Sequence, residues 1–452
     1  MAIRQLDATP YNSHLGTFDA AQKVFYSNLL GTAIINEFPE YAWLKKEGRI
    51  SSQTPPGGKY IEFLFESLPS SGAGWRGEGD RLPIAGRVTN TTGKVAWRKF
   101  IKGRTTLTWE ALKWGTKGLG NMIDARKQEF DRIMTAMRHR AIPAFWGNGD
   151  GVLGYINGAV SSSTSVTMLQ SETYNKLAPG TRWIFPGVQV ISCNTPANSY
   201  GLDSSMTGAV IVNRRTSNTA LTMASAISAT DAYVLVEHEC ADTSNTAERT
   251  YGSVSLGTAS SCRWPTGFNA MCDNGTFVSS YEGISESTYD WSANVLHNSG
   301  TLRPPTTALG REMYYKIGQR HGKPPTGLVG WMNYDLHQEY IKQLEPFVEY
   351  APRNFKPGDN SYDWVFGGTE IPLKMSYNVP MYIYFLHPES INFIEHTPPG
   401  IGGQDDQYGD MYERVTDYDQ FQSVFRWGFQ LWTHDRKNFG VIRDIQATVK
   451  TL

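Results

Sequence analysis

A long amphipathic helix followed at once by a glycine-dense turn constrains the fold of this chain most. Apolar residues recur every three or four positions from 119 to 142, between charged residues, which predicts one helix of roughly 36 Å. We expect Pro143 to end this helix, because proline lacks a backbone N–H and disfavours helical geometry in the residue before it. The sequence GNGDG at 147–151 then predicts a connecting turn, since it lacks the Lys-Ser or Lys-Thr of a phosphate-binding loop.

The composition is that of a folded protein with a large core and nearly equal numbers of positive and negative side chains. The 452 residues are 40% hydrophobic and carry a net charge of −1, which argues against a sequence-specific nucleic-acid binder and a membrane-surface protein. We expect no secretory leader at the N-terminus and no membrane-spanning segment. Four widely spaced cysteines without a C-x-x-C pair indicate a reducing compartment rather than a zinc site or a disulfide framework.

Two strand-like stretches separated by a polar tract predict a long two-stranded ribbon. Residues 59–68 alternate in polarity, with Ile61, Phe63 and Phe65 on one face, and residues 95–109 are rich in Trp, Phe, Ile and Thr. A ribbon of only two strands is marginal in water, so we expect an adjacent subunit to cover its aromatic side chains. The candidates for inter-subunit contacts are Phe63, Phe65, Trp75, Trp97, Phe100 and Trp109.

The rest of the chain mixes helical and β-rich segments, which indicates an α+β protein. Residues 18–44 have helical spacing, residues 160–265 consist of short apolar runs between Ser, Thr, Gly and Asn, and residues 306–320 predict another helix. Strand and helix propensities alternate beyond that helix, and residues 421–449 again predict strands.

No motif in the sequence indicates a catalytic, cofactor or metal site. The run GTKGLGNMI at 115–123 has Ile123 where the third glycine of a G-x-G-x-x-G dinucleotide-binding loop would stand, and it lacks the βαβ context of such a loop. His238 and Cys240 supply only two ligands to a metal ion, and the acidic residues from 405 to 419 do not have EF-hand spacing. We therefore expect no catalytic residues, no cofactor and no metal.

Three segments, taken with the order of helical arm, ribbon and long helix, give the chain a family resemblance. They are GDGVLGYINGA at 149–159, GFNAMCDNGTFVSSYEGISESTYDWSANVLHNSGTL at 267–302 and GREMYYKIGQRHGKPPTGLVGWMNYDLHQEYIKQL at 310–344. With these segments the chain resembles the major capsid proteins of tailed bacteriophages, which have the HK97-type fold. In that family the ribbon is the E-loop, the long helix is the spine helix of the peripheral domain, and an axial domain of mixed strands and helices follows.

The resemblance implies a division of the chain into six parts. The minimal fold of the family does not include residues 160–265, so we expect an inserted β-rich domain there. The parts are an N-terminal helical arm at 1–58, the extended β-ribbon or E-loop at 59–115, the spine helix and start of the peripheral domain at 116–159, the β-rich insertion at 160–265, the continued peripheral domain at 266–325, and the axial domain with C-terminal strands at 326–452.

The function that the resemblance implies is structural and not enzymatic. Copies of the chain would form hexamers and pentamers of an icosahedral shell, assembled in the host cytoplasm, that encloses double-stranded DNA without sequence specificity. Scaffold, portal and decoration proteins are further partners implied by the family, and no membrane is involved. The aromatic content and the β-rich middle also suit an alternative of another class, a carbohydrate-active enzyme or carbohydrate-binding protein, although no segment supplies a pair of catalytic carboxylates.

Overall fold

The chain forms two compact units, each built from segments that lie far apart in the sequence. The first unit consists of Met1–Phe38, Phe100–Ala141 and Glu395–Phe429, and the second consists of Pro39–Lys99, Ile142–Ile394 and Gln430–Leu452. The structure is a computed structural model that describes residues 38–51, 60–68, 75–78, 81, 89–96, 99–108, 125–170, 177, 179–193, 210–230, 233–236, 264–344, 363–401, 413–414 and 419–447. Within these residues, no helix combines the length and the apolar character needed to span a membrane.

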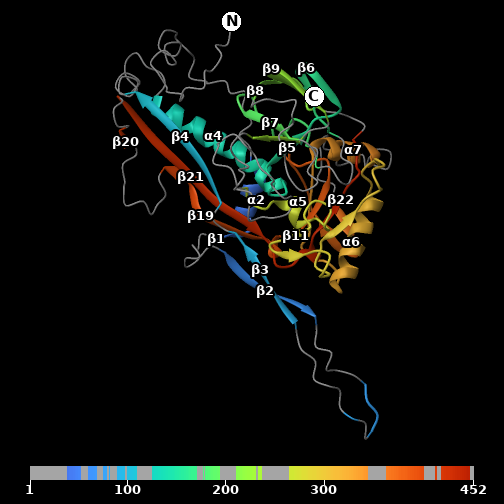
Figure 1. Cartoon of the computed structure of the whole chain (residues 1–452). Helices are drawn as coiled ribbons and strands as arrows, with labels where there is room; N and C mark the ends of the chain where they lie inside the picture. The colour runs from blue at the N-terminus through green and yellow to red at the C-terminus, as the bar shows by residue number, and fades with distance from the viewer. Residues whose placement is uncertain are drawn as a thin grey trace, which may run out of the picture. The chain divides into compact units, whose positions relative to one another are not determined.

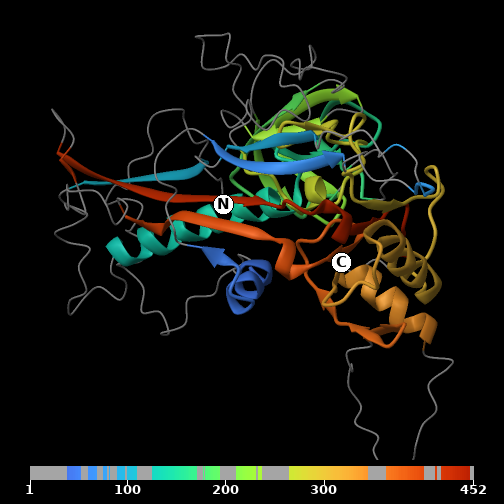
Figure 2. The ribbon, with the colours of Figure 1, turned by 90° about the horizontal axis from the view of Figure 1, so that it is seen from below.

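Long antiparallel strands beside one long helix make up the first unit (Figures 1 and 2). Strand β4 (Phe100–Thr108) pairs with β21 (Gln420–Trp432), and β21 also pairs with β19 (Asn392–Ile401) and β20 (Glu413–Arg414). The short strand β1 (Ile50–Ser51) pairs in parallel with Phe393 and Ile394, and these residues belong to the second unit.

Helix α4 (Ala125–Trp146) covers one face of these strands. The ring of Phe130 meets the ring of Phe425 edge to face, with centroids 5.3 Å apart. Gly103 lies opposite Phe425, and a Cβ atom at Gly103 would lie 3.3 Å from Ile133 of the helix. The missing side chain therefore lets α4 approach the sheet closely. The presence of a long helix here agrees with the prediction made from apolar spacing.

The expectation that Pro143 ends the long helix is wrong, because α4 continues through Pro143 to Trp146. The carbonyl of Pro143 still accepts a hydrogen bond from the Gly147 amide, at 2.8 Å. An interior proline costs about 3 kcal/mol. Full burial of Phe145 and Trp146, both 0% exposed, contributes about 1.5–3 kcal/mol each and offsets that loss. The predicted start of the helix, at 119–124, lies outside the described residues.

The glycine-dense turn after α4 is shaped by backbone geometry, as the sequence indicates. Gly149 and Gly151 have φ angles of +83° and +78°, in the left-handed region that glycine adopts without strain. Between them, the buried carboxylate of Asp150 accepts a hydrogen bond from the Val152 amide at 3.1 Å. Burial raises the pKa of Asp150 to about 6. The turn leads directly into β5 (Val152–Tyr155).

A largely buried five-stranded sheet forms one core of the second unit. Its order is β13-β22-β18-β14-β17, with parallel pairs at both edges and antiparallel pairs in the middle. Helices α6 (Thr307–His321) and α7 (Tyr334–Leu344) contribute to the same apolar cluster as the strands. The strands are β13 (Asn294–Leu296), β14 (Val329–Met332), β17 (Leu373–Met375), β18 (Ile383–Leu386) and β22 (Gly440–Ile442). Helix α6 confirms the helix predicted from 306–320, and Gly322 caps its end with a φ of +79°.

A six-stranded sheet of order β5-β10-β7-β8-β9-β6 contains the described strands of residues 160–236. Its edge strand β5 precedes that segment. Buried contacts join the region to the five-stranded sheet: Arg182 pairs with Asp335 of α7 at 2.7 Å, and the Trp183 indole donates to the Asn378 carbonyl at 2.8 Å. The other strands are β6 (Ala159–Thr167), β7 (Gln189–Cys193), β8 (Val210–Arg215), β9 (Ala220–Thr230) and β10 (Tyr233–Val236). That 160–265 is a separate insertion domain stays a prediction.

The ribbon exists, but its return strand differs from the predicted one. Strand β2 (Ile61–Leu68) pairs with β3 (Thr89–Val95), whereas most of the predicted return stretch 95–109 forms β4 and pairs with β21. The sequence TNTTGKV of β3 has little apolar alternation, and tertiary contacts to β2 outweigh its weak strand propensity.

Helix α2 (Pro39–Lys46) agrees with the end of the predicted N-terminal helical arm. The arm's earlier part, up to residue 37, lies outside the described residues. Two further hairpins, β11 (Ser280–Tyr281) with β12 (Ile284–Ser285) and β15 (Trp364–Phe366) with β16 (Thr369–Ile371), belong to the second unit.

Candidate functional site

The β2–β3 ribbon has two chemically different faces. Phe63 lies opposite Gly93 on one face, and Leu64 lies opposite Thr92 on the other. The face of Phe63 is half-buried or buried, and the face of Leu64 is exposed, with Leu64 itself 76% exposed. This confirms the alternation predicted for 59–68. Glu62 and Lys94 form an ion pair at 3.3 Å on the exposed face.

The half-buried face of the ribbon rests on aromatic side chains of its own chain. Phe63 stacks on Trp432 with centroids 5.2 Å apart, and Phe65 lies 5.2 Å from Trp291. A Cβ atom at Gly93 would lie 2.3 Å from the Phe63 ring, so only glycine leaves room for that ring. Phe63 and Phe65 were predicted as inter-subunit contacts; their contact with a neighbouring subunit stays a prediction.

Hydrogen bonds fix the second strand of the ribbon to the same region. The Lys94 amide donates to the Glu282 carbonyl at 2.8 Å, and the Thr91 hydroxyl donates to Tyr289 at 3.1 Å. Sequence reasoning did not single out Glu282, Trp291 or Trp432. For the first, the only local signal is Gly283 between two short strand-like runs, because glycine is typical of the second position of a two-residue hairpin turn.

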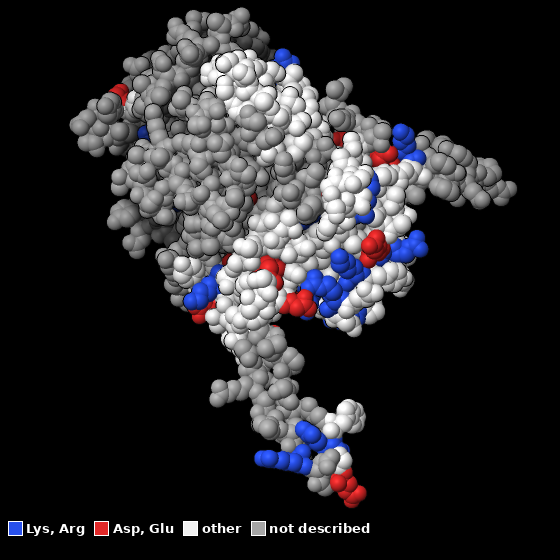
Figure 3. Space-filling model, turned by 45° about the vertical axis from the view of Figure 1, so that its right-hand side comes forward, with Lys and Arg blue, Asp and Glu red and all other residues white. Residues whose placement is uncertain are grey.

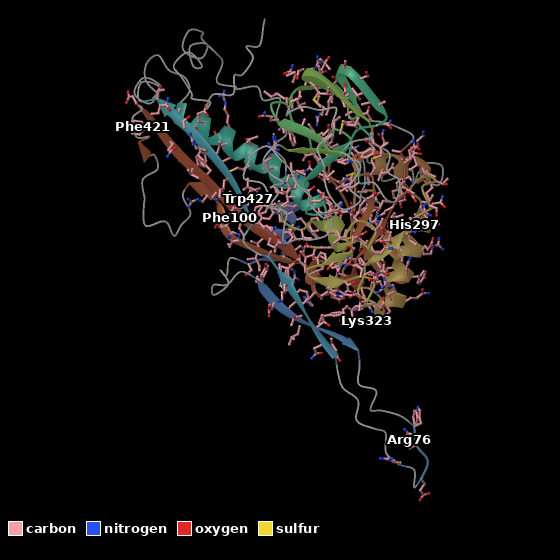
Figure 4. All side chains as sticks on the ribbon, viewed as in Figure 1. Arg76, Phe100, His297, Lys323, Phe421 and Trp427 are labelled. Carbon is pink, nitrogen blue, oxygen red and sulfur yellow. The ribbon has the colours of Figure 1, made fainter. Side chains whose placement is uncertain are left out.

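The loop between β2 and β3 carries an aromatic and charged tip. Trp75 is 103% exposed, and Arg76, Glu78 and Arg81 are exposed as well. Figure 3 shows basic and acidic side chains together at this tip, and Figure 4 labels Arg76 there. An indole that is fully in water is unusual, because burial of such a side chain is favourable by about 2–3 kcal/mol. Exposed aromatics of this kind are typical of interfaces.

Phe100 begins β4 in the first unit and is 42% exposed (Figure 4). Its ring lies 4.6 Å from the ring of His396, and the amine of Lys102 lies 6.0 Å from its centroid. Lys102 is directly opposite Arg426 across the strands, so two basic side chains lie next to each other on this sheet face. The remaining predicted contacts, Trp97 and Trp109, lie outside the described residues.

Two buried ion pairs lie elsewhere in the second unit. Arg443 pairs with Asp273 at 2.7 Å with both side chains 0% exposed, and Arg436 pairs with Glu286. Burial raises the pKa of the Cys272 thiol, which disfavours its reactive thiolate form. Within the described part of the chain, no three His, Cys, Asp or Glu side chains gather to hold a metal ion. His238, Cys240 and most of the acidic run 405–419 lie outside that part.

Comparison with solved structures shows the fold. The capsid subunit of cyanophage A-1(L) is similar over 93% of this chain and 96% of that chain, with a TM-score of 0.56 at 11% identity. The capsid of a native GTA particle matches over 95% of this chain and 99% of that chain (TM-score 0.42, 8% identity). The holo-SrpI encapsulin complex from Synechococcus elongatus matches over 100% and 99% (TM-score 0.41, 7% identity).

No family model matches the sequence, and no curated protein matches it. The similarity to the cyanophage subunit extends over nearly the whole of both chains. The chain therefore has the α+β, HK97-type capsid fold that the sequence resemblance implied.

Proposed function

We propose that this chain is a major capsid protein, copies of which assemble as hexamers and pentamers into an icosahedral shell around the double-stranded DNA of a tailed phage. The observation that carries the proposal is the fold, shared over 93% of the chain with the cyanophage A-1(L) capsid subunit at a TM-score of 0.56. On this proposal the role is structural rather than enzymatic, and the protein belongs to the virion shell after assembly in the host cytoplasm.

The ribbon and its tip supply surfaces that suit contact between copies. Leu64 and Trp75 expose apolar area that a monomer leaves in water. Covering each side chain would contribute about 2–3 kcal/mol, and a closed ring repeats the contact at every subunit. The candidate contacts Phe63, Phe65, Trp75, Trp97, Phe100 and Trp109 keep this role as part of the proposal.

The net charge of the chain supports a shell that encloses DNA rather than a protein that binds DNA phosphates tightly. The net charge is −1, and tight binding of phosphates needs a large excess of Lys and Arg. On this proposal, contact with the packaged DNA is non-specific, and scaffold, portal and decoration proteins are the further partners.

Shortening the loop tests the proposal without removing either strand of the ribbon. Residues 71–86 are replaced by a short Gly-Ser linker, which leaves β2 and β3 intact. We expect a folded subunit, with an unchanged circular dichroism spectrum, that no longer forms closed shells in electron micrographs. Tyr315→Ala is the matched control, because Tyr315 is 53% exposed on α6, outside the ribbon. Closed particles at the wild-type yield from the shortened chain would contradict the role of the tip.

A further inference from the structure

The turn that receives the ribbon contains a residue that such turns rarely use. Tyr281 and Ile284 pair across the β11–β12 hairpin, and the two residues between them, Glu282 and Gly283, have φ angles of +47° and +83°. A two-residue turn with two positive φ angles favours Asn, Asp or Gly at its first position. Glutamate is not one of the residues that this backbone conformation favours. Its side chain is also buried, at 1% exposed, instead of extending into water.

The buried carboxyl group of Glu282 is only partly satisfied by hydrogen bonds. Its Oε1 accepts a hydrogen bond from the Thr266 hydroxyl at 2.9 Å, and that hydroxyl accepts one from Gln430 at 3.1 Å. Its Oε2 is buried and accepts no hydrogen bond from any residue that the structure describes. A buried carboxylate oxygen without a donor is costly, whereas a protonated carboxyl carries no charge and needs fewer donors.

The charged groups around this carboxyl come from two other segments. Lys99, 8% exposed, precedes β4, and Arg436 comes from the 3₁₀ helix Arg436–Asn438; both favour the ionised form. The phenol of Tyr281, the preceding residue, is a further titratable neighbour, and the Arg436 that faces Glu282 also pairs with Glu286. Burial outweighs the two cations and raises the pKa of Glu282 to about 7. The group therefore titrates near neutral pH.

The same residue contacts the ribbon through its backbone. The carbonyl of Glu282 accepts the amide of Lys94 in β3, at 2.8 Å. Lys99 follows β3 by four residues, between Val95 at the end of that strand and Phe100 at the start of β4. A movement of the turn that brings the Glu282 carboxylate to water would therefore break the bond to Lys94.

We propose that Glu282 is a proton-sensitive clasp at the base of the β2–β3 ribbon: the neutral carboxyl keeps the turn closed on β3, and the ionised carboxylate favours release of the strand. The clasp goes beyond the proposed function and does not depend on assembly, because it is a property of the single chain.

The direction of the pH effect follows from the raised pKa. A carboxyl whose pKa is higher in the closed state than in water binds its proton more tightly when closed. Its contribution to the closed state is complete below its ordinary value of 4.5 and is lost as the pH rises through about 7. Opening should therefore increase with pH, by on the order of tenfold between pH 6 and 8 if the carboxyl becomes fully hydrated on opening.

Hydrogen exchange at the Lys94 amide measures this opening directly. Exchange is followed by NMR or mass spectrometry on the full chain at pH 6 and pH 8, with labelling times scaled for the intrinsic pH dependence of exchange. We expect the protection of Lys94 to fall by about tenfold from pH 6 to 8 in the wild type and to stay constant in Glu282→Gln, which mimics the neutral carboxyl. The Gly330 amide, bonded to the Pro372 carbonyl at 2.9 Å, is the internal reference.

A second variant keeps the test decisive if Glu282→Gln does not fold. Lys99→Gln removes a cation that favours ionisation, so the midpoint of the protection change should move to higher pH. Equal protection of Lys94 at both pH values in the wild type would overturn the clasp. So would a pH dependence that persists in Glu282→Gln, or a midpoint that does not move in Lys99→Gln.

Discussion

The ring of Phe63 stacks on the indole of Trp432, with centroids 5.2 Å apart, and so attaches the ribbon to the last residue of β21. The two residues are separated by most of the length of the chain. The ribbon therefore has one face that packs on Trp432 and one exposed face, called here the free face. Leu64, the next residue along β2, lies on the free face. The two faces of one strand should respond differently to the same truncation.

Phe63→Ala should lower the free energy of unfolding by about 1–3 kcal/mol, less than for a core phenylalanine because the side chain is half-buried. Leu64→Ala, on the free face, should change it by less than about 0.5 kcal/mol. Urea denaturation of both variants measures the difference. Equal effects of the two substitutions would show that the stacking on Trp432 does not anchor the ribbon.

Phe130→Pro should break α4 at its contact with Phe425, at a loss of about 3 kcal/mol or more. Soluble, assembly-competent subunits should be lost with it. Phe130→Leu is the control, since it keeps the helix and most of the apolar contact. The yield of soluble protein and its thermal midpoint report the outcome, and a wild-type yield from the proline variant would refute the helix as a structural requirement.

Glu40→Gln should become more stable than the wild type as the pH rises. Burial raises the pKa of Glu40, while the hydrogen bonds from Ser376 at 2.5 Å and Trp146 at 2.9 Å lower it in part. A raised pKa means that the folded state favours the protonated carboxyl, so wild-type stability falls as the pH increases above 4.5. The urea midpoints of the two proteins between pH 5 and 8 should diverge.

The exposed Glu47 lies one residue beyond the end of the same helix and provides the matched control. Glu47→Gln removes an exposed carboxylate and should change the free energy of unfolding by less than about 0.5 kcal/mol. If the Glu40→Gln and wild-type curves stay parallel instead, Glu40 is not held in its protonated form.

Arg182→Met should lower the free energy of unfolding by about 3–5 kcal/mol, because it leaves the buried charge of Asp335 without its partner at 2.7 Å. Arg132→Gln disrupts a more exposed pair, Arg132 with Glu129 at 3.3 Å, and should cost no more than about 1 kcal/mol. Denaturation curves compare the two. A loss of less than 1 kcal/mol at Arg182 would mean that this ion pair does not stabilise the contact between the six-stranded sheet region and α7.

Local patterns predicted the elements whose signals lie within one stretch of chain. Alternation located β2, and the helical pattern of residues 306–320 located α6. The glycine turn at 147–151 was predicted because positive φ angles need glycine whatever surrounds them.

Contacts between residues that lie far apart in the sequence explain the elements that local patterns did not predict. Strand β3 depends on Gly93, which leaves room for the Phe63 ring, and α4 passes Pro143 because Phe145 and Trp146 are buried beyond it. The platform of Trp291 and Trp432 comes from segments far along the chain, and no local pattern pairs them with Phe63. The exposed tip at Trp75 could be proposed from composition alone, since aromatic residues in a polar loop favour an interface.

Electron microscopy of the purified wild-type chain, at concentrations where its sedimentation profile is also recorded, tests the central claim most directly. The account predicts rings or closed shells of many copies, with a corresponding fast-sedimenting species. A chain that remains strictly monomeric under every assembly condition would contradict the proposal that this fold builds a capsid.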